Sequence, residues 1–165
     1  MKPQLTQKPT TLVDGSVEPS PAARGAGANN MTKRPLLRSS AAVALGFILT
    51  AALSVITDVI LHAVGVFPPW TQQVPSGLLL LAVLYRVIFT IAGGWVTARL
   101  APNRTMKHVA ILGALGTVAA SIGAFATWNA GPQFGPHWYP LALIVTALPA
   151  VWIGGRLFLS KQSAS

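Results

Sequence analysis

Four long apolar segments constrain the fold of this chain more than any other feature of its sequence. They lie near residues 39–62, 77–100, 107–127 and 140–159. Each is about 20 residues long or slightly longer, which is the length that an α-helix needs to cross a hydrocarbon core of roughly 30 Å. A spanning segment must satisfy its own backbone hydrogen bonds, and these segments are too long for barrel strands. The sequence therefore predicts an all-α polytopic membrane protein whose four transmembrane helices form an antiparallel bundle.

The composition agrees with this fold class and excludes several others. Of the 165 residues, 52% are hydrophobic and 9% are charged, whereas a typical globular protein carries roughly 25% charged residues. A water-soluble enzyme domain is therefore excluded. The chain contains no cysteine, which excludes disulfide scaffolds, thiol redox chemistry, cysteine nucleophiles and cysteine-based zinc sites.

The chain divides into two parts by composition. Residues 1–35 are rich in proline, threonine, serine, glycine and alanine, and such a segment cannot bury enough apolar surface to offset the entropy of ordering it. We expect a disordered cytoplasmic tail there and a transmembrane domain over residues 36–160. Met31 is an alternative start of the chain. A transit peptide is a weaker alternative, because Asp14, Glu18 and the prolines fit it poorly.

The first apolar segment has a second interpretation as a signal peptide. Basic residues precede it, and Ala52-Leu53-Ser54 loosely resembles a cleavage site. However, its apolar core is longer than the usual 7–15 residues. We therefore favour an uncleaved first span.

The placement of charge predicts the orientation in the membrane. Basic residues occur before the first span, between the second and third spans, and at the end of the fourth: Lys33, Arg34, Arg38, Arg99, Arg104, Lys107, Arg156 and Lys161. The other two loops carry aromatic residues but no lysine or arginine. By the positive-inside bias, both termini are cytoplasmic. We expect a multi-pass protein of the bacterial inner membrane whose basic residues attract anionic lipid headgroups, and we expect no nucleic-acid binding.

Asp58 and Arg86 are the two strongly charged residues well inside the apolar segments. Because both are equally far in sequence from Gln72, a helical hairpin would place them at similar depth and predicts an ion pair. His62 follows Asp58 by four residues and lies on the same helix face, whereas Tyr85 is expected to point to a different face. One interpretation is a site that handles protons or anions near the outer side. The interpretation that we favour is an ion pair that fixes the register of two helices, with His62 extending to the interface.

Small residues form a second pattern, which is typical of helix packing in membranes. The third segment carries them at helical spacing, and the second carries a matching patch; the candidate packing residues are Gly93, Gly94, Gly113, Gly116, Thr117, Ala120, Gly123 and Ala124. A pore lining or a sliding interface is the alternative interpretation of this pattern.

Motifs for catalysis or metal binding are absent from the sequence. The three histidines, His62, His108 and His137, are expected at different membrane levels, so they predict no metal site. Metalloprotease, nucleophile-elbow, phosphate-loop and EF-hand motifs do not occur. We therefore expect neither enzymatic activity nor a cofactor.

Several residues give the chain a resemblance to a group of known proteins. These residues are Arg86, Gly93-Gly94, the run from Ala98 to Pro102, Lys107-His108, Gly113, Gly116, Trp138-Tyr139-Pro140, Pro149 and Gly154-Gly155-Arg156. With them, residues 80–158 resemble small hypothetical four-span membrane proteins of bacteria. The resemblance implies a bacterial inner-membrane location and transfers no catalytic residue.

Two function classes follow from the sequence. The favoured one is a non-enzymatic membrane protein, a structural or accessory subunit that acts through helix packing. The alternative is a small oligomeric transporter or channel subunit that uses Asp58, His62 and Arg86. In either class the expected partners are the lipid bilayer and a second copy of the chain or another membrane protein.

Overall fold

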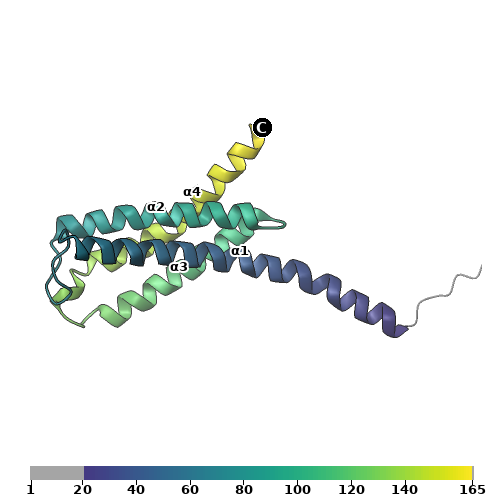
Figure 1. The fold of residues 1–165 in the computed structure, drawn as a ribbon, viewed down its shortest axis with the longest axis horizontal. Coiled ribbons are helices and arrows are strands. Elements are labelled where there is room, and N and C mark those ends of the chain that lie inside the picture. Colours follow the sequence, from purple (N-terminus) through teal and green to yellow (C-terminus); the bar gives the residue numbers. More distant parts are fainter. Residues whose placement is uncertain (1–20, 165) are drawn as a thin grey trace, which may run out of the picture. The chain divides into compact units, whose positions relative to one another are not determined.

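Helices account for nearly all of the regular structure that is described. The computed structural model describes the backbone of residues 21–164 and the side chains of residues 38–164. Its elements are α1 (Pro21–Ala63), α2 (Ser76–Leu100), α3 (Thr105–Thr127), the 3₁₀ turn η1 (Pro132–Phe134) and α4 (Trp138–Ser163). Figure 1 labels the α-helices. Four helices are long and apolar enough to cross a membrane. The predicted all-α fold with four such helices is therefore confirmed.

The N-terminal segment is described only in part. Residues 1–20 lie outside the described residues. The structure has residues 21–35 as the first part of α1, whereas the sequence predicts disorder there. Since residues 1–33 and 34–165 form separate units, the fold below is that of the second unit. The tail over residues 1–35 and the alternative start at Met31 stay predictions.

Prolines and one left-handed residue set the helix ends. α2 begins after Pro75, whose backbone oxygen accepts hydrogen bonds from the next turn. It ends at Leu100 because Ala101 precedes Pro102, and a residue before proline is forced away from the helical region; Ala101 has a ψ of 123°. α3 begins after Arg104, which has a φ of +48°. α4 begins at Trp138, earlier than the predicted apolar segment. Pro140 therefore falls in the first turn of the helix, where proline costs no hydrogen bond.

Contacts between α1 and α2 show that these two helices run in opposite directions. The Thr97 hydroxyl donates to the backbone oxygen of Ala42 at 3.2 Å, and the Thr50 hydroxyl donates to that of Phe89 at 3.2 Å. A Cβ added at Gly93 would lie 2.8 Å from the backbone oxygen of Gly46. Only glycine on both helices allows this approach, and the short distance between backbones explains why threonine hydroxyls reach across.

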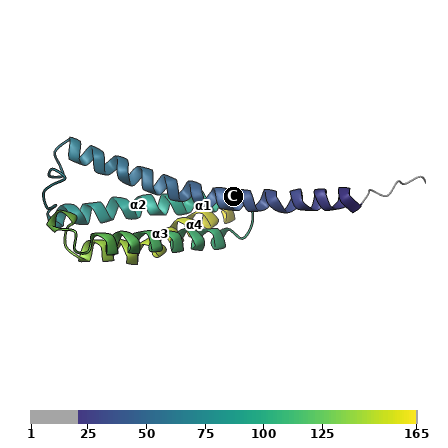
Figure 2. The same ribbon diagram turned by 90° about the horizontal axis from the view of Figure 1, so that it is seen from below.

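α4 packs against α2 and α3 through a further set of glycines. A Cβ added at Gly94 would lie 2.5 Å from the backbone oxygen of Val151, and one added at Gly154 would collide with the backbone oxygen of Ile91. Gly113 of α3 faces Leu148 of α4. In Figure 2, α1 lies on one side of α2, and α3 and α4 lie on the other side. α2 is therefore the central helix of the described bundle.

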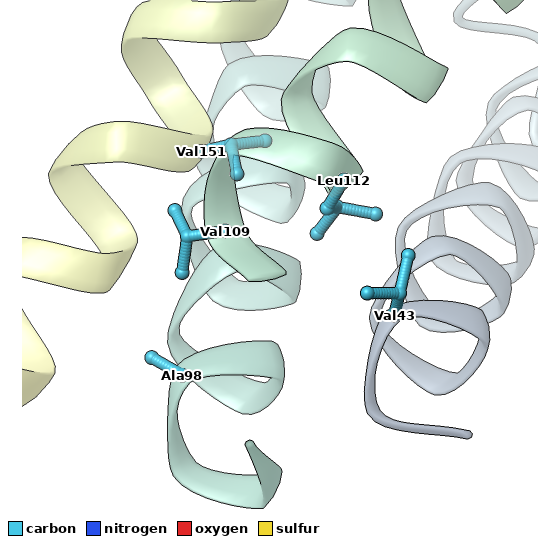
Figure 3. Close-up of a cluster of buried hydrophobic side chains, with 5 residues drawn as sticks. All are labelled: Val43, Ala98, Val109, Leu112 and Val151. Carbon is cyan, nitrogen blue, oxygen red and sulfur yellow. The ribbon is translucent and has the colours of Figure 1, made fainter. Parts of the chain in front are cut away.

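Two apolar clusters hold the bundle together. The first contains one or more residues from every helix: Val43, Ala98, Val109, Leu112 and Val151 (Figure 3). The second lies near the loop that follows α1 and contains Phe67, Ala82 and Tyr85, with Leu61, Leu78, Phe89 and Tyr139 packed around them. The buried side chains are mostly small or branched, as expected for membrane helices, which associate by close packing.

The outer surface of the helices is apolar. Phe125 is 88% exposed, Val145 is 71% exposed and Ile122 is 64% exposed. A water-soluble monomer rarely exposes large contiguous apolar patches, whereas lipid tails accommodate such side chains without cost. The exposed surface therefore agrees with a multi-pass membrane protein.

Candidate functional site

The structure brings Asp58 of α1 and Arg86 of α2 together inside the apolar spans. The Nη2 group of Arg86 donates a hydrogen bond to Oδ2 of Asp58 and forms an ion pair with it. The two side chains retain 30% (Arg86) and 18% (Asp58) of their exposure. Because charge is costly in hydrocarbon unless it is paired, this contact offsets the cost of both groups.

Tyr85 is a member of the same site, contrary to the expectation that it points to a different face. Its hydroxyl donates to Oδ1 of Asp58, the carboxylate oxygen that Arg86 leaves open. Adjacent helix residues project about 100° apart, but the long side chains of Tyr85 and Arg86 converge on a carboxylate that lies between them. Both oxygens of Asp58 therefore accept a hydrogen bond from α2.

Tyr139 adds a third helix to this charged cluster, which we define as Asp58, Tyr85, Arg86 and Tyr139. Tyr139 lies in the first turn of α4, within interaction distance of Arg86, and packs on the apolar cluster around Phe67. In the sequence, Tyr139 stands directly before Pro140 at the start of the fourth apolar segment. The only signal for its role is a tyrosine at the start of a span, and that pattern is equally typical of an interfacial anchor.

His62 contacts the loop that follows α1 and is not part of the charged cluster. Its Nδ1 lies 2.8 Å from the backbone oxygen of Asp58, which can only accept, so Nδ1 carries a proton. The imidazole stacks on the Trp70 ring with centroids 3.5 Å apart and meets Phe67 edge-on at 5.3 Å. The two Asp58 carboxylate oxygens face α2, so the structure does not join His62 to the ion pair through its side chain.

Five of the candidate packing residues are buried or meet another helix. Gly93, Gly94 and Gly113 meet another helix, as described above. Gly116 lies in α3, where an added Cβ would be 4.0 Å from the Cβ of Ala147. Ala124 is buried.

The remaining candidates on α3 are Thr117, Ala120 and Gly123. The Thr117 hydroxyl donates to the backbone oxygen of Gly113 in its own helix, and Ala120 is half-buried. Gly123 is exposed, and an added Cβ would meet nothing within 4 Å. The sequence shows the small-residue stripe but not its partners: Gly113 and Gly116 face α4, and the glycines of α2 face α1 and α4.

A cavity of about 300 Å³ lies among the four helices beside the charged cluster. Arg86 forms part of its wall, and most of the other lining residues are apolar or carry a hydroxyl: Phe47, Thr50, Ser54, Val55, Val87, Thr90, Leu112, Gly116, Ala120, Leu143, Thr146, Ala147 and Val151, among others. The Nε of Arg86 is buried and has no hydrogen-bond partner among the described residues. Arg86 is the one charged residue in the wall of this cavity.

Basic residues at the other end of the helices contact tryptophans one turn earlier. The Arg99 guanidinium lies 5.4 Å from the centre of the Trp95 ring, and that of Arg156 lies 5.6 Å from the Trp152 ring. These pairs are typical of side chains that anchor a helix end at an interface. Trp95 and Trp152 lie inside the apolar segments, so the sequence alone does not show that they contact the basic residues.

The described residues contain no group of three or more histidine, cysteine, aspartate or glutamate side chains that could hold a metal ion. His62 and His137 each stack on a tryptophan, Trp70 and Trp128 respectively. His108 has a buried Nδ1 without a partner among the described residues.

Comparison with protein-family models, with curated proteins and with solved structures finds no match for the chain. The fold therefore indicates a broad class of protein only. Four apolar helices of sufficient length are compatible with a multi-pass integral membrane protein.

Proposed function

We propose that this chain is a non-enzymatic integral membrane protein, a structural or accessory subunit that associates with another membrane protein or a second copy of itself through helix packing. We place it in the bacterial inner membrane with both termini cytoplasmic, because the basic residues gather at one end of the spans. Anionic lipid headgroups contact Arg99 and Arg156 at that end.

The observation that carries this proposal is the exposed small-residue surface of α3. Ala119 and Gly123 are four residues apart, and both are exposed. A glycine in a helix interior costs roughly 0.5–1 kcal/mol relative to alanine, and Gly123 relieves no contact within the chain. Small residues at this spacing allow a second helix to approach closely. The surface therefore suits a helix from outside the described fold.

The charged cluster supports the same proposal. Both carboxylate oxygens of Asp58 are occupied by donors from α2. A carboxylate held in this way positions α1 on α2. The cluster is thus suited to holding two helices in register.

The test compares Gly123→Leu with Gly77→Leu, since an added Cβ meets nothing within 4 Å at either glycine. Full-length protein is extracted from membranes in mild detergent, and its particle mass is measured by native electrophoresis and light scattering. We expect a mass above that of one chain for the wild type and Gly77→Leu, and a single chain for Gly123→Leu. A single chain in all three samples, or a complex that survives Gly123→Leu, would contradict the proposal.

The second candidate is a small oligomeric transporter or channel subunit. The observation in its favour is the cavity that places Arg86 beside polar groups of α1, α2 and α4. Reconstitution in liposomes separates the two candidates. Flux of protons, ions or amphiphilic cations that is lost in the Asp58→Asn, Arg86→Leu double variant would support transport and contradict the accessory role.

A further inference from the structure

A shallow hollow of about 620 Å³ lies where α2 ends and α4 approaches its own end. Its wall is formed by Trp95, Arg99, Phe158, Lys161 and Gln162. Arg99 is the basic residue in the last turn of α2, and Lys161 is the basic residue in the last turn of α4. The C-terminal part of α4 extends beyond α2 (Figure 1). The hollow therefore lies where two apolar helices give way to polar residues, which is the level of lipid headgroups in a membrane protein.

Trp95 and Phe158 form the apolar part of this wall. Their rings meet edge to face with centroids 5.9 Å apart, and both side chains are half-buried. Phe158 also packs against the apolar cluster that contains Ala98 and Val109. The two rings are thus held in place from both helices, and they offer an apolar surface that suits hydrocarbon.

The polar part of the wall is positively charged. Arg99 and Lys161 are both exposed, and no acidic residue lines the hollow. Asp58 is the one acidic residue that follows Glu18 in the sequence, and it is paired with Arg86. Two like charges that share one hollow repel each other, and an anion between them relieves this repulsion. The charge of the wall is therefore complementary to an anion.

The donors in the wall suit phosphate oxygens. The Arg99 guanidinium lies 5.4 Å from the centre of the Trp95 ring, which holds it at the wall. A guanidinium has five N–H groups, more than one ring contact occupies, and charged donors form strong hydrogen bonds with phosphate. The side-chain amide of Gln162 adds a neutral donor. A phosphate group beside a hydrocarbon chain would therefore match both parts of the wall.

We propose that this hollow binds one anionic phospholipid, whose phosphodiester lies between Arg99 and Lys161 and whose acyl chain lies along Trp95 and Phe158. The site rests on the proposed orientation, since anionic lipids are abundant in the cytoplasmic leaflet. A soluble phosphate would leave the apolar part of the wall unused. The site differs from a general attraction between basic residues and the membrane, because it holds a single lipid that joins α2 to α4.

The test counts the lipids bound to the full chain in detergent by native mass spectrometry. Phosphatidylglycerol and phosphatidylcholine with identical acyl chains are compared at equal concentration, because they differ in net charge. One basic residue near an anionic surface strengthens binding by about fivefold. With two such residues, we expect the first phosphatidylglycerol to bind about twentyfold more tightly than the first phosphatidylcholine. Equal affinities for the two lipids would overturn the proposal.

Arg156 provides a matched control for Arg99. Each arginine is exposed and contacts a tryptophan one turn earlier, but Arg156 and Trp152 do not line the hollow. We expect Arg99→Gln and Lys161→Gln each to weaken binding of the first phosphatidylglycerol by about fivefold. Arg156→Gln is expected to weaken it by less than about twofold, because a charge farther from the lipid is screened. Equal weakening by Arg99→Gln and Arg156→Gln would indicate a diffuse attraction and would overturn the proposal.

Two further measurements use wild-type protein and do not depend on how the variants fold. Inorganic phosphate in large molar excess is expected to leave phosphatidylglycerol bound, and displacement would contradict a lipid as the ligand. Phosphatidylglycerol with brominated acyl chains is expected to quench tryptophan fluorescence more than brominated phosphatidylcholine does, because its chain lies along Trp95. Equal quenching by the two lipids would contradict the site. These experiments measure lipid binding and the Gly123→Leu comparison measures particle mass, so each proposal can fail separately.

Discussion

The Asp58–Arg86 ion pair gives the most specific prediction about stability. Asp58→Asn removes the counter-charge of an arginine whose side chain is 30% exposed, and Arg86→Leu removes one of the two donors to a carboxylate that is 18% exposed. Hydrogen bonds to charged groups contribute about 1.5–3 kcal/mol, and breaking a fully buried pair costs about 3–5 kcal/mol. Because both groups keep some exposure, each single change is expected to lower the free energy of unfolding by about 2 kcal/mol.

The double variant is expected to cost no more than either single change. With both substitutions in place no unpaired charge remains, and the Tyr85 hydroxyl can still donate to the amide oxygen of the new asparagine. The coupling energy is therefore about 2 kcal/mol. The assay is reversible unfolding of the purified protein in mixed micelles, followed by circular dichroism during titration with dodecyl sulfate.

The control cycle combines Asp58→Asn with Arg99→Leu. Arg99 is exposed and contacts Trp95 at the far end of α2, so these two losses are expected to add within about 0.5 kcal/mol. Additive losses for Asp58→Asn and Arg86→Leu would refute the reasoning, because they would mean that the two side chains do not stabilise each other.

Four further changes test the packing and the tail. Gly154→Ala is expected to destabilise the protein by about 1–3 kcal/mol in the same titration, since the new Cβ would collide with the backbone of Ile91, whereas Gly123→Ala is expected to be neutral or stabilising. Thr97→Val removes a buried hydrogen bond to Ala42, and a loss of about 0.6 kcal/mol is expected; a loss above about 2 kcal/mol would disagree with that single bond. Deletion of residues 1–30 is expected to leave membrane insertion and thermal stability unchanged, and a clear decrease in either quantity would show that the tail contributes to the fold.

The four helices were predictable because the signal is long and continuous. An apolar segment of about 20 residues or more with little charge has few other stable structures. The helix ends were less predictable. α4 continues to Ser163 through Ser160 and Lys161, since a helix can extend into water once its apolar part is anchored.

The charged cluster was predictable only in part. Equal distance from the hairpin loop was enough to pair Asp58 with Arg86. It could not show that Tyr85 shares the carboxylate or that Tyr139 joins from α4, because both depend on the packing of helices that are distant in sequence. The orientation of the His62 side chain depends in the same way on Trp70. Trp70 lies in a loop, so its position cannot be inferred from helical periodicity.

The pairing of small-residue faces was also beyond the sequence. The glycines of α2 and the stripe of α3 have the same composition, so composition alone suggests that they pack together. In the structure Gly93 faces Gly46, Gly94 faces Val151 and Gly113 faces Leu148. Many pairings of small faces have similar energies, and the order of helices in the bundle decides among them.

Cysteine labelling tests the proposed four-span topology with both termini in the cytoplasm most directly, because the chain has no cysteine of its own. Single cysteines at Gln73 and Gln133 are expected to react with an impermeant thiol reagent added to intact cells, whereas cysteines at Asn103 and Ser163 are expected to react only after the cells are opened. The basis is the absence of lysine and arginine from the two loops that contain Gln73 and Gln133. Labelling of Asn103 but not of Gln73 in intact cells would contradict this account.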